Sequence, residues 1–263
     1  MRINNNITAI NSHRQYTINN SSIGKNVEKL SSGFRVNRAG DDAAGLAISE
    51  KMRTQIRGLN MASKNSQDGI SLVQTAEGAM QTAHNIMQRM RELAVQSRNG
   101  TNDISVDRNA LDLEFSQLTA EISQIANTVK FNDMTVFNVT FTIQSGANSA
   151  DITVFSVASL VQPGGDVSTE TNAAIAIGKM TEWINQLSTN RATLGAIQNR
   201  LEFKIQNLDN SAENLAAAES RIRDVDMAKM MTEFTKNNIL FQASTAMLAQ
   251  ANAIPQSVLQ LVG

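Results

Sequence analysis

Residues 180–222 read MTEWINQLSTNRATLGAIQNRLEFKIQNLDNSAENLAAAESRI, and the spacing of their apolar side chains decides the predicted fold. Apolar residues recur there at intervals of three and four positions, a pattern typical of a helix in a coiled coil. Only Arg191, Gln198 and Glu219 place polar side chains in this stripe. The stripe consists of Met180, Ile184, Leu187, Arg191, Leu194, Gln198, Leu201, Ile205, Leu208, Ala212, Leu215, Glu219 and Ile222.

The length of this helix indicates the shape of the molecule. At about 1.5 Å per residue it would extend roughly 65 Å, whereas a compact domain of 263 residues has a radius of gyration of only about 18 Å. We therefore predict an elongated rod, in which other helices must cover the apolar stripe. The only prolines, Pro163 and Pro255, leave the first half of the chain without an obligatory helix breaker.

The first half of the chain supplies the partner helices. A second long helix is predicted from Asp42 to about Ser97, with apolar residues on two of its sides. A turn cluster at 99–102 separates it from a third helix over 107–129. The three stripes comprise Met52, Ile56, Leu59, Ile70 and Val73; Leu72, Ala76, Ala79, Ala83, Ile86, Met90 and Leu93; and Leu111, Phe115, Leu118, Ile122, Ile125 and Val129.

The residues from about 131 to 161 have a different composition. β-branched and aromatic residues alternate with polar ones at 140–143 and 152–155, and a polar loop at 145–150 separates the two runs. This pattern predicts a β-hairpin, followed by a polar linker from Pro163 to about Thr171, beyond which the long helix begins. The predicted fold class is therefore mainly α: an elongated antiparallel α-helical coiled-coil rod with paired N- and C-terminal helices and a small β-hairpin region.

Both ends of the chain also show helical apolar stripes, which we predict to pair with each other. The last stripe of the C-terminus, Met247, Ala251, Ile254, Val258 and Leu261, is so apolar that a free helix would fray or aggregate unless the other terminus or neighbouring molecules covered it. We therefore expect identical molecules to cover these stripes when they stack. The stripe residues are Ile3, Ile7, Ile10, Ile23, Val27, Leu30 and Phe34 near the N-terminus, and Met231, Phe234, Phe241, Met247, Leu248, Ile254, Val258 and Leu261 near the C-terminus.

Charge and hydropathy argue against several classes of partner. The 23 basic and 24 acidic residues are interspersed, so we expect no binding of nucleic acid or of an anionic membrane surface. No run of about 18 apolar residues predicts a membrane span, and the Asn-rich start does not resemble a secretory signal. A membrane-interacting amphipathic protein remains an alternative, although the near-neutral charge argues against it.

No arrangement of residues in the sequence predicts an active site, a cofactor site or a metal site. Asp41 and Asp42 are adjacent carboxylates, but they precede a helix and are interpreted as capping residues. His13 and His84 lie on different predicted helices and lack the spacing of zinc ligands. The chain has no cysteine, which excludes disulfides and thiolate chemistry. We therefore predict that the protein is not an enzyme.

Several long stretches resemble bacterial flagellins, and together they cover most of the chain outside roughly 135–175. They are LSSGFRVNRAGDDAAGLAIS at 30–49, QDGISLVQTAEGAM at 67–80, QRMRELAVQSRNGT at 88–101, LGAIQNRLEFKIQNLDNSAENLAAAESRIRDVD at 194–226 and QASTAMLAQANAIPQSVLQLV at 242–262. The resemblance implies a structural subunit that self-assembles into the extracellular helical filament used for swimming. The hairpin occupies the place where many flagellins carry outer domains, so a short form is implied.

The resemblance also implies an organisation into layers. The helices of 1–41 and 225–263 would form an inner coiled-coil layer, while 42–179, with the hairpin, and 180–224 would form the rod domain around it. Export would use the flagellum's own type III apparatus, with a chaperone covering 225–263 beforehand. Filament cap and hook-junction proteins would be further partners. A hook-filament junction protein, which shares the terminal architecture, is the alternative within the structural class.

One predicted helix face has the composition of a binding surface. It combines an arginine and an apolar side chain with polar neighbours, as binding hot spots do, although an ordinary contact between subunits would have the same composition. In flagellins the matching positions also contact the Toll-like receptor for flagellin, so the resemblance implies recognition of the monomer by that receptor. The expected face comprises Gln88, Arg89, Glu92, Leu93 and Gln96, with Glu114 as a further contact.

Overall fold

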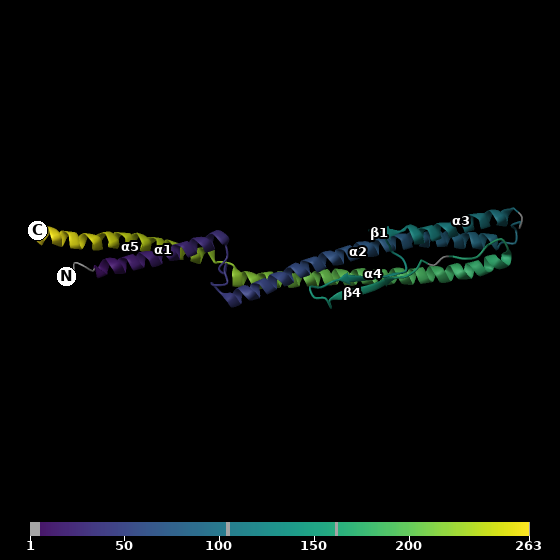
Figure 1. The fold of residues 1–263 in the computed structure, drawn as a ribbon. Coiled ribbons are helices and arrows are strands. Elements are labelled where there is room, and N and C mark those ends of the chain that lie inside the picture. Colours follow the sequence, from purple (N-terminus) through teal and green to yellow (C-terminus); the bar gives the residue numbers. More distant parts are fainter. Residues whose placement is uncertain (1–5, 104–105, 161–162, 263) are drawn as a thin grey trace. The chain divides into compact units, whose positions relative to one another are not determined.

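Five helices and four short strands make up the described part of the chain in a computed structural model, in the order shown in Figure 1. The structure describes residues 6–103, 106–160 and 163–262, with side chains up to residue 254. The helices are α1 (Ile7–Ser32), α2 (Ala43–Ser97), α3 (Asp107–Thr128), α4 (Glu170–Arg223) and α5 (Met227–Val262), and the strands are β1 (Lys130–Phe131), β2 (Met134–Thr135), β3 (Val139–Gln144) and β4 (Ile152–Val157).

The predicted fold class is confirmed, because long helices dominate and β structure is confined to small antiparallel pairs. Helix α4 starts ten residues before the predicted stripe begins. Its start is capped by Thr169, whose hydroxyl accepts a hydrogen bond from the Asn172 amide at 3.2 Å. The small β1–β2 pair was not predicted; Asn132 and Asp133 form its turn with φ of 49° and 61°.

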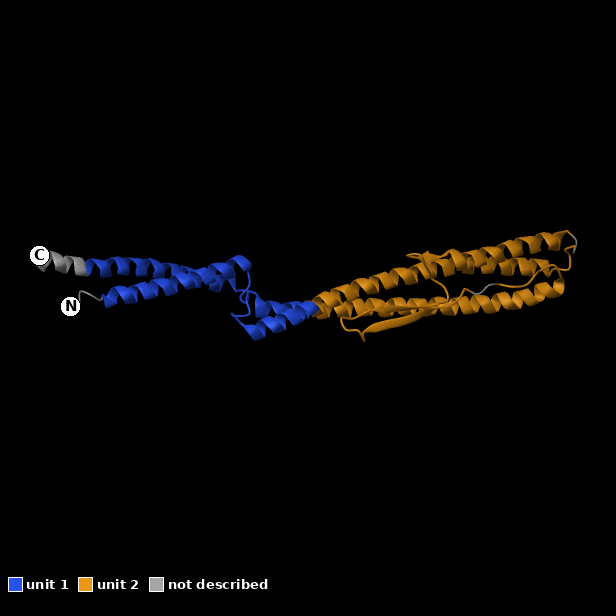
Figure 2. Ribbon diagram, in the orientation of Figure 1, with its two compact units in different colours: residues 1–54, 214–263 blue, residues 55–213 orange. Residues whose placement is uncertain are grey.

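The chain divides into two compact units, which Figure 2 shows in separate colours. Unit 1 contains residues 1–54 and 214–263, and unit 2 contains residues 55–213. These limits differ from the segment ends at 41 and 224 that the sequence led us to predict. The expectation that 1–41 and 225–263 form the inner layer of an assembled filament stays a prediction.

Unit 2 has one continuous apolar core formed by parts of α2 and α4 together with α3 and the β3–β4 hairpin. Helices α2 and α4 run antiparallel, since Arg191 pairs with Glu77 at 3.4 Å and Arg91 donates a hydrogen bond to Thr181 at 3.3 Å. The predicted stripe of α4 faces this core. Its buried members within unit 2 are Met180, Leu187, Leu194, Leu201, Leu208 and Ala212.

The β3–β4 hairpin packs against α2 where two glycines allow a close approach. A Cβ atom at Gly58 would lie 2.9 Å from the Cβ of Ala147, in the hairpin loop. A Cβ at Gly69 would lie 3.3 Å from the Ile143 side chain. The Asn65 side chain also donates a hydrogen bond to the carbonyl oxygen of Gln144 at 3.2 Å. The hairpin is therefore held along this helix and covers the core of unit 2.

In unit 1, α1 and α5 lie side by side and run antiparallel. The Asn6 side chain donates a hydrogen bond to the Ala251 carbonyl at 2.7 Å, and Tyr16 stacks against Phe241 with ring centroids 4.9 Å apart. Helix α1 ends at Ser32 and is capped by Gly33, whose φ of 74° suits a residue without a side chain. Among the described residues of unit 1, Val36 and Ala251 are the only buried hydrophobic ones.

Candidate assembly and binding surfaces

The helix pair of unit 1 leaves much of its apolar surface exposed. Two helices bury only the sides that face each other, so apolar residues elsewhere on α1 and α5 remain in contact with solvent. Ile10 is 62% exposed and Met247 is 65% exposed. Of the predicted stripe residues, those that are exposed are Ile7, Ile10, Val27, Met231, Met247 and Ile254, and those that are half-buried are Ile23, Leu30, Phe34, Phe234, Phe241 and Leu248.

The predicted positions Ile3, Val258 and Leu261 lie outside the residues whose side chains the structure describes. Other apolar residues of the same helices are exposed although they were not predicted. These are Ile18 on α1 and Met227, Ile239 and Leu240 on α5. The prediction followed two apolar stripes at each end of the chain, and these four residues lie outside those stripes. None of the described helices combines the length and the hydropathy that a membrane span requires.

A shallow groove lies between the two helices of unit 1. It has a volume of about 310 Å³, and Leu240, Ala243 and Met247 supply its apolar lining from α5. The α1 side is polar and consists of Asn11, Ser12 and Gln15. No residue of the described chain that lines the groove is charged, so an apolar side chain of another molecule could enter it without burying an unpaired charge of this lining.

A group of contacts in unit 1 joins the chain after α1 to the end of α4. The Arg223 guanidinium lies 4.7 Å from the centre of the Phe34 ring and donates a hydrogen bond to the Glu50 carboxylate. The Arg223 carbonyl accepts a hydrogen bond from the Arg35 amide at 2.6 Å. The hydrogen bond from Arg223 lowers the pKa of Glu50, and those from the amides of Arg38 and Asn37 lower the pKa of Asp41.

Acid is expected to weaken the Glu50–Arg223 contact. Because the pKa of Glu50 is lower in the folded chain, the pair stabilises unit 1 above the unfolded pKa of about 4.3, and this contribution is lost as the pH falls through the lowered value. An NMR titration of the Glu50 carboxyl carbon should therefore give a midpoint below that of an ordinary glutamate. The midpoint should rise in an Arg223→Gln variant, and an unchanged midpoint would contradict the assignment.

The predicted binding face lies on α2 in unit 2, and most of it is exposed. Gln88, Arg89, Glu92 and Gln96 all have exposed side chains. Arg89 pairs with Glu92 at 3.2 Å and with Glu114 of α3 at 2.9 Å. The hydrogen bond that Arg89 donates to the Glu114 carboxylate is the main reason that the pKa of Arg89 is raised. The structure therefore brings Glu114 next to this face, which sequence spacing alone did not establish.

The expectation that Leu93 provides an apolar anchor on this face is wrong. Its side chain is 0% exposed and belongs to the core of unit 2. The physical reason is the helical repeat, which places Leu93 in the same buried stripe as Met90 and Ala83 and turns it away from Arg89 and Glu92. We use the term amide-arginine face below for Gln88, Arg89, Glu92, Gln96 and Glu114.

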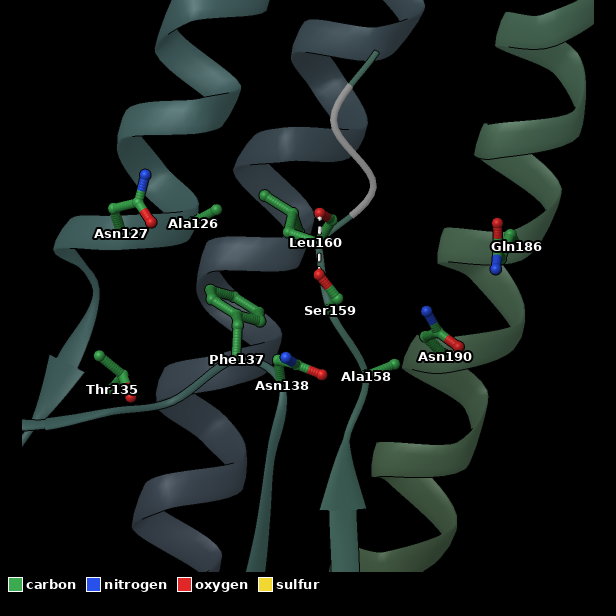
Figure 3. A pocket seen from close by; sticks show the side chains of 10 residues that line it. All are labelled: Ala126, Asn127, Thr135, Phe137, Asn138, Ala158, Ser159, Leu160, Gln186 and Asn190. Atoms are coloured by element: carbon green, nitrogen blue, oxygen red, sulfur yellow. Dashed lines mark hydrogen bonds between the residues drawn. The ribbon is translucent and has the colours of Figure 1, made fainter. Parts of the chain in front are cut away.

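A second groove of about 650 Å³ lies in unit 2 between the end of α3, the strands and α4 (Figure 3). Carboxamide side chains dominate its lining, while Phe137 and Leu160 are buried within it. Among the described residues, the lining holds no acidic, basic or histidine side chain, and its hydrogen-bonding groups are uncharged. Its polar lining residues are Asn127, Thr135, Asn138, Ser159, Gln186 and Asn190.

Comparison with known proteins gives matches along nearly the whole chain. Residues 3–142 match the model of the bacterial flagellin N-terminal helical region, and residues 177–262 match that of the C-terminal helical region. A flagellin of Halalkalibacterium halodurans is 56% identical and one of Bacillus subtilis is 51% identical, each with 100% of both chains covered.

A solved structure shows a related fold. The crystal structure of Bacillus cereus flagellin matches with a TM-score of 0.52 and 32% identity, covering 59% of this chain and 94% of that chain. The two family-model matches, residues 3–142 and 177–262, each include residues of both unit 1 and unit 2.

Proposed function

The chain belongs to the bacterial flagellin family, and we propose from this premise that the exposed apolar sides of α1 and α5 are the surfaces through which its copies stack. As a member of that family it is a structural subunit of the flagellar filament and not an enzyme. The observation that carries the proposal is that unit 1 buries only two hydrophobic residues among those described.

Burial of these side chains supplies the driving force for stacking. Fully burying one large apolar side chain contributes about 1.5–3 kcal/mol, and unit 1 presents several such residues, including Ile10, Ile239 and Met247. Association costs on the order of 4–15 kcal/mol in lost freedom of movement. A few buried side chains per contact are enough to offset this cost. Contacts between non-identical faces generate an open helical polymer.

Seeded growth tests this function directly. Purified full-length chain added to short filament fragments of the same protein should elongate them, as followed by light scattering and electron microscopy. Fragments of an unrelated helical polymer serve as the control for non-specific deposition. A chain that remains monomeric beside its own fragments would contradict the proposal.

The exposed apolar surface of α1 and α5 also supports contacts with an export chaperone and with filament cap and hook-junction proteins. Before assembly, the exposed side chains of Ile239, Leu240 and Met247 would promote aggregation unless they are covered. We infer that an export chaperone covers 225–263 and that export uses the type III apparatus of the flagellum. Filament cap and hook-junction proteins would then contact the same terminal helices at the two ends of the filament.

We further infer that the Toll-like receptor for flagellin recognises the amide-arginine face of the monomer. The face offers an exposed arginine that already forms two ion pairs, surrounded by polar side chains that can hydrogen-bond to a partner. Replacing Arg89 with aspartate reverses this charge and places it beside Glu92 and Glu114. We expect receptor signalling by the monomer to fall at least roughly tenfold, which corresponds to about 1.4 kcal/mol.

The measurement is a reporter-cell assay with purified monomer, and Arg200→Asp is the matched control. Arg200 is also exposed and also lies on a helix of unit 2, but it is not part of the face. Equal signalling by Arg89→Asp and the unaltered chain, at equal helix content, would remove this inference. A loss of signalling in both variants would show that the effect is not specific to the face.

A further inference from the structure

The turn between α2 and α3 contains an Asn-Gly pair, Asn99–Gly100, and both residues are exposed. In such a pair the glycine has no side chain to shield its backbone nitrogen from the neighbouring asparagine side chain. A Cβ placed at Gly100 would meet no atom of the described chain within 4 Å apart from the adjacent residues, so no distant segment crowds this glycine. Asparagine is one of the thermally labile residues of proteins.

The structure adds two donors at the peptide bond between these residues. The carbonyl oxygen of Asn99 accepts a hydrogen bond from the backbone N–H of Asn102 at 3.2 Å and another from the Arg108 guanidinium at 3.3 Å. Arg108 is only 5% exposed, so its charge is poorly screened by solvent. Both hydrogen bonds, and above all the charge-assisted one from Arg108, withdraw electrons from the peptide group and make the Gly100 N–H more acidic.

The reacting groups are the backbone nitrogen of Gly100 and the side-chain carboxamide of Asn99. Among the described residues, neither the Gly100 N–H nor the side-chain NH₂ of Asn99 donates a hydrogen bond. The Thr101 amide donates to the side-chain oxygen of Asn99 at 3.4 Å, which makes the side-chain carbon a better electrophile. The hydrogen bonds therefore favour both the loss of the proton from the Gly100 nitrogen and the attack of that nitrogen on the side-chain carbon of Asn99.

We propose that Asn99 is a site of spontaneous deamidation and that Arg108 promotes the reaction. The Gly100 nitrogen loses its proton to solvent and forms a bond to the side-chain carbon of Asn99. The bond from that carbon to the NH₂ group breaks, and the nitrogen leaves as ammonia after taking up a proton. Water then opens the resulting succinimide ring at either carbonyl, which yields aspartate or isoaspartate at position 99.

The product changes the surface at the end of α2. Either form adds one negative charge just beyond Ser97, the last residue of α2, where the helix dipole disfavours an anion. The new carboxylate lies three residues from Gln96 of the amide-arginine face. Isoaspartate also lengthens the backbone of the turn by one methylene group. A long-lived copy would thus come to differ from a newly made one at this position.

Peptide mapping by mass spectrometry of the full-length chain, incubated at mildly alkaline pH, tests the proposal. Position 99 should gain about 1 Da at least roughly tenfold faster than Asn148. Asn148 precedes Ser149 in an exposed turn but donates its side-chain NH₂ to Asp151 at 3.0 Å. The Gly100→Ala variant, which meets no steric obstacle, should react roughly tenfold more slowly. An Asn99 that is no faster than Asn148 would overturn the proposal.

The role of Arg108 is tested separately. The rate at Asn99 in the folded chain should equal or exceed that in the same chain unfolded by urea, because unfolding removes the guanidinium from the carbonyl. An Arg108→Met variant that retains the helix content of the unaltered chain should react more slowly. A folded chain that reacts much more slowly than the unfolded one would show that the turn protects Asn99, and this would contradict promotion by Arg108.

Discussion

A chain that carries aspartate in place of both Ile239 and Met247 is expected to lose filament growth while its helices remain intact. Both side chains are exposed, at 60% and 65%, so the single molecule loses no packing. Substitutions at such surface positions usually change the free energy of unfolding by less than about 0.5 kcal/mol. In the stacked state, by contrast, each aspartate would bury an unpaired charge, which costs several kcal/mol.

The expected result is a critical concentration for elongation that rises more than about 100-fold, equivalent to roughly 2.7 kcal/mol per added copy. It is measured by sedimentation after seeded growth, with circular dichroism to confirm the helix content. Gln250→Asp is the matched control, since it adds a charge to an exposed polar position of the same helix. Normal growth of the double variant would show that these side chains stay in solvent in the filament.

Replacing Leu93 with aspartate is expected to unfold unit 2. Removing the leucine side chain from a core position costs about 2–5 kcal/mol, and burying an uncompensated carboxylate adds a further penalty of several kcal/mol. Leu93 is completely buried within the core that α2, α3 and α4 share. The sum is comparable with the whole stability of a domain, which is about 5–15 kcal/mol.

The measurement is thermal unfolding followed by circular dichroism, with Leu113→Asp as the control. Leu113 lies on α3 and is 67% exposed, so the same substitution should leave the unfolding temperature nearly unchanged. If Leu93→Asp unfolded at the same temperature as the unaltered chain, the placement of this side chain in the core would be wrong. The experiment also shows why Leu93 cannot be used to probe receptor binding.

The long helices could be predicted because their buried residues repeat with a regular spacing. In α4 the leucines at 187, 194 and 201 fall in one stripe, and all are buried as predicted. The polar members of that stripe do not disturb it, since Arg191 is only half-buried and pairs with Glu77. The start of α4 was predicted from the end of the polar linker at about Thr171, and the helix begins at Glu170, directly after the cap at Thr169.

The binding face was predicted less well because one spacing supports two interpretations. Leu93 fits both the stripe of Ala83 and Met90 and the surface group of Arg89 and Glu92. Only the packing of α3 and α4 decides between them. Contacts between distant segments, such as that of Glu50 with Arg223, could not be predicted from spacing, because they depend on where α4 ends and how the chain turns after α1.

The grooves and the Asn99 turn illustrate the same limit. The groove in unit 2 combines residues from four separate segments, and none of them forms a recognisable motif in the sequence. Asn99 and Gly100 were identified only as a turn. The hydrogen bond from Arg108 to the Asn99 carbonyl oxygen, which we propose promotes deamidation, could not be predicted from the sequence because it forms only when α3 folds back along α2.

The absence of cysteine allows the central claim to be measured with a single introduced thiol. A Met247→Cys variant is alkylated as a monomer and again after assembly onto filament fragments, with Ser149→Cys in the exposed hairpin loop of unit 2 as a comparison. If the apolar sides of α1 and α5 are buried when copies stack, alkylation of the thiol at position 247 should slow at least tenfold on assembly, equivalent to about 1.4 kcal/mol. A thiol that reacts equally fast in monomer and filament would contradict the account.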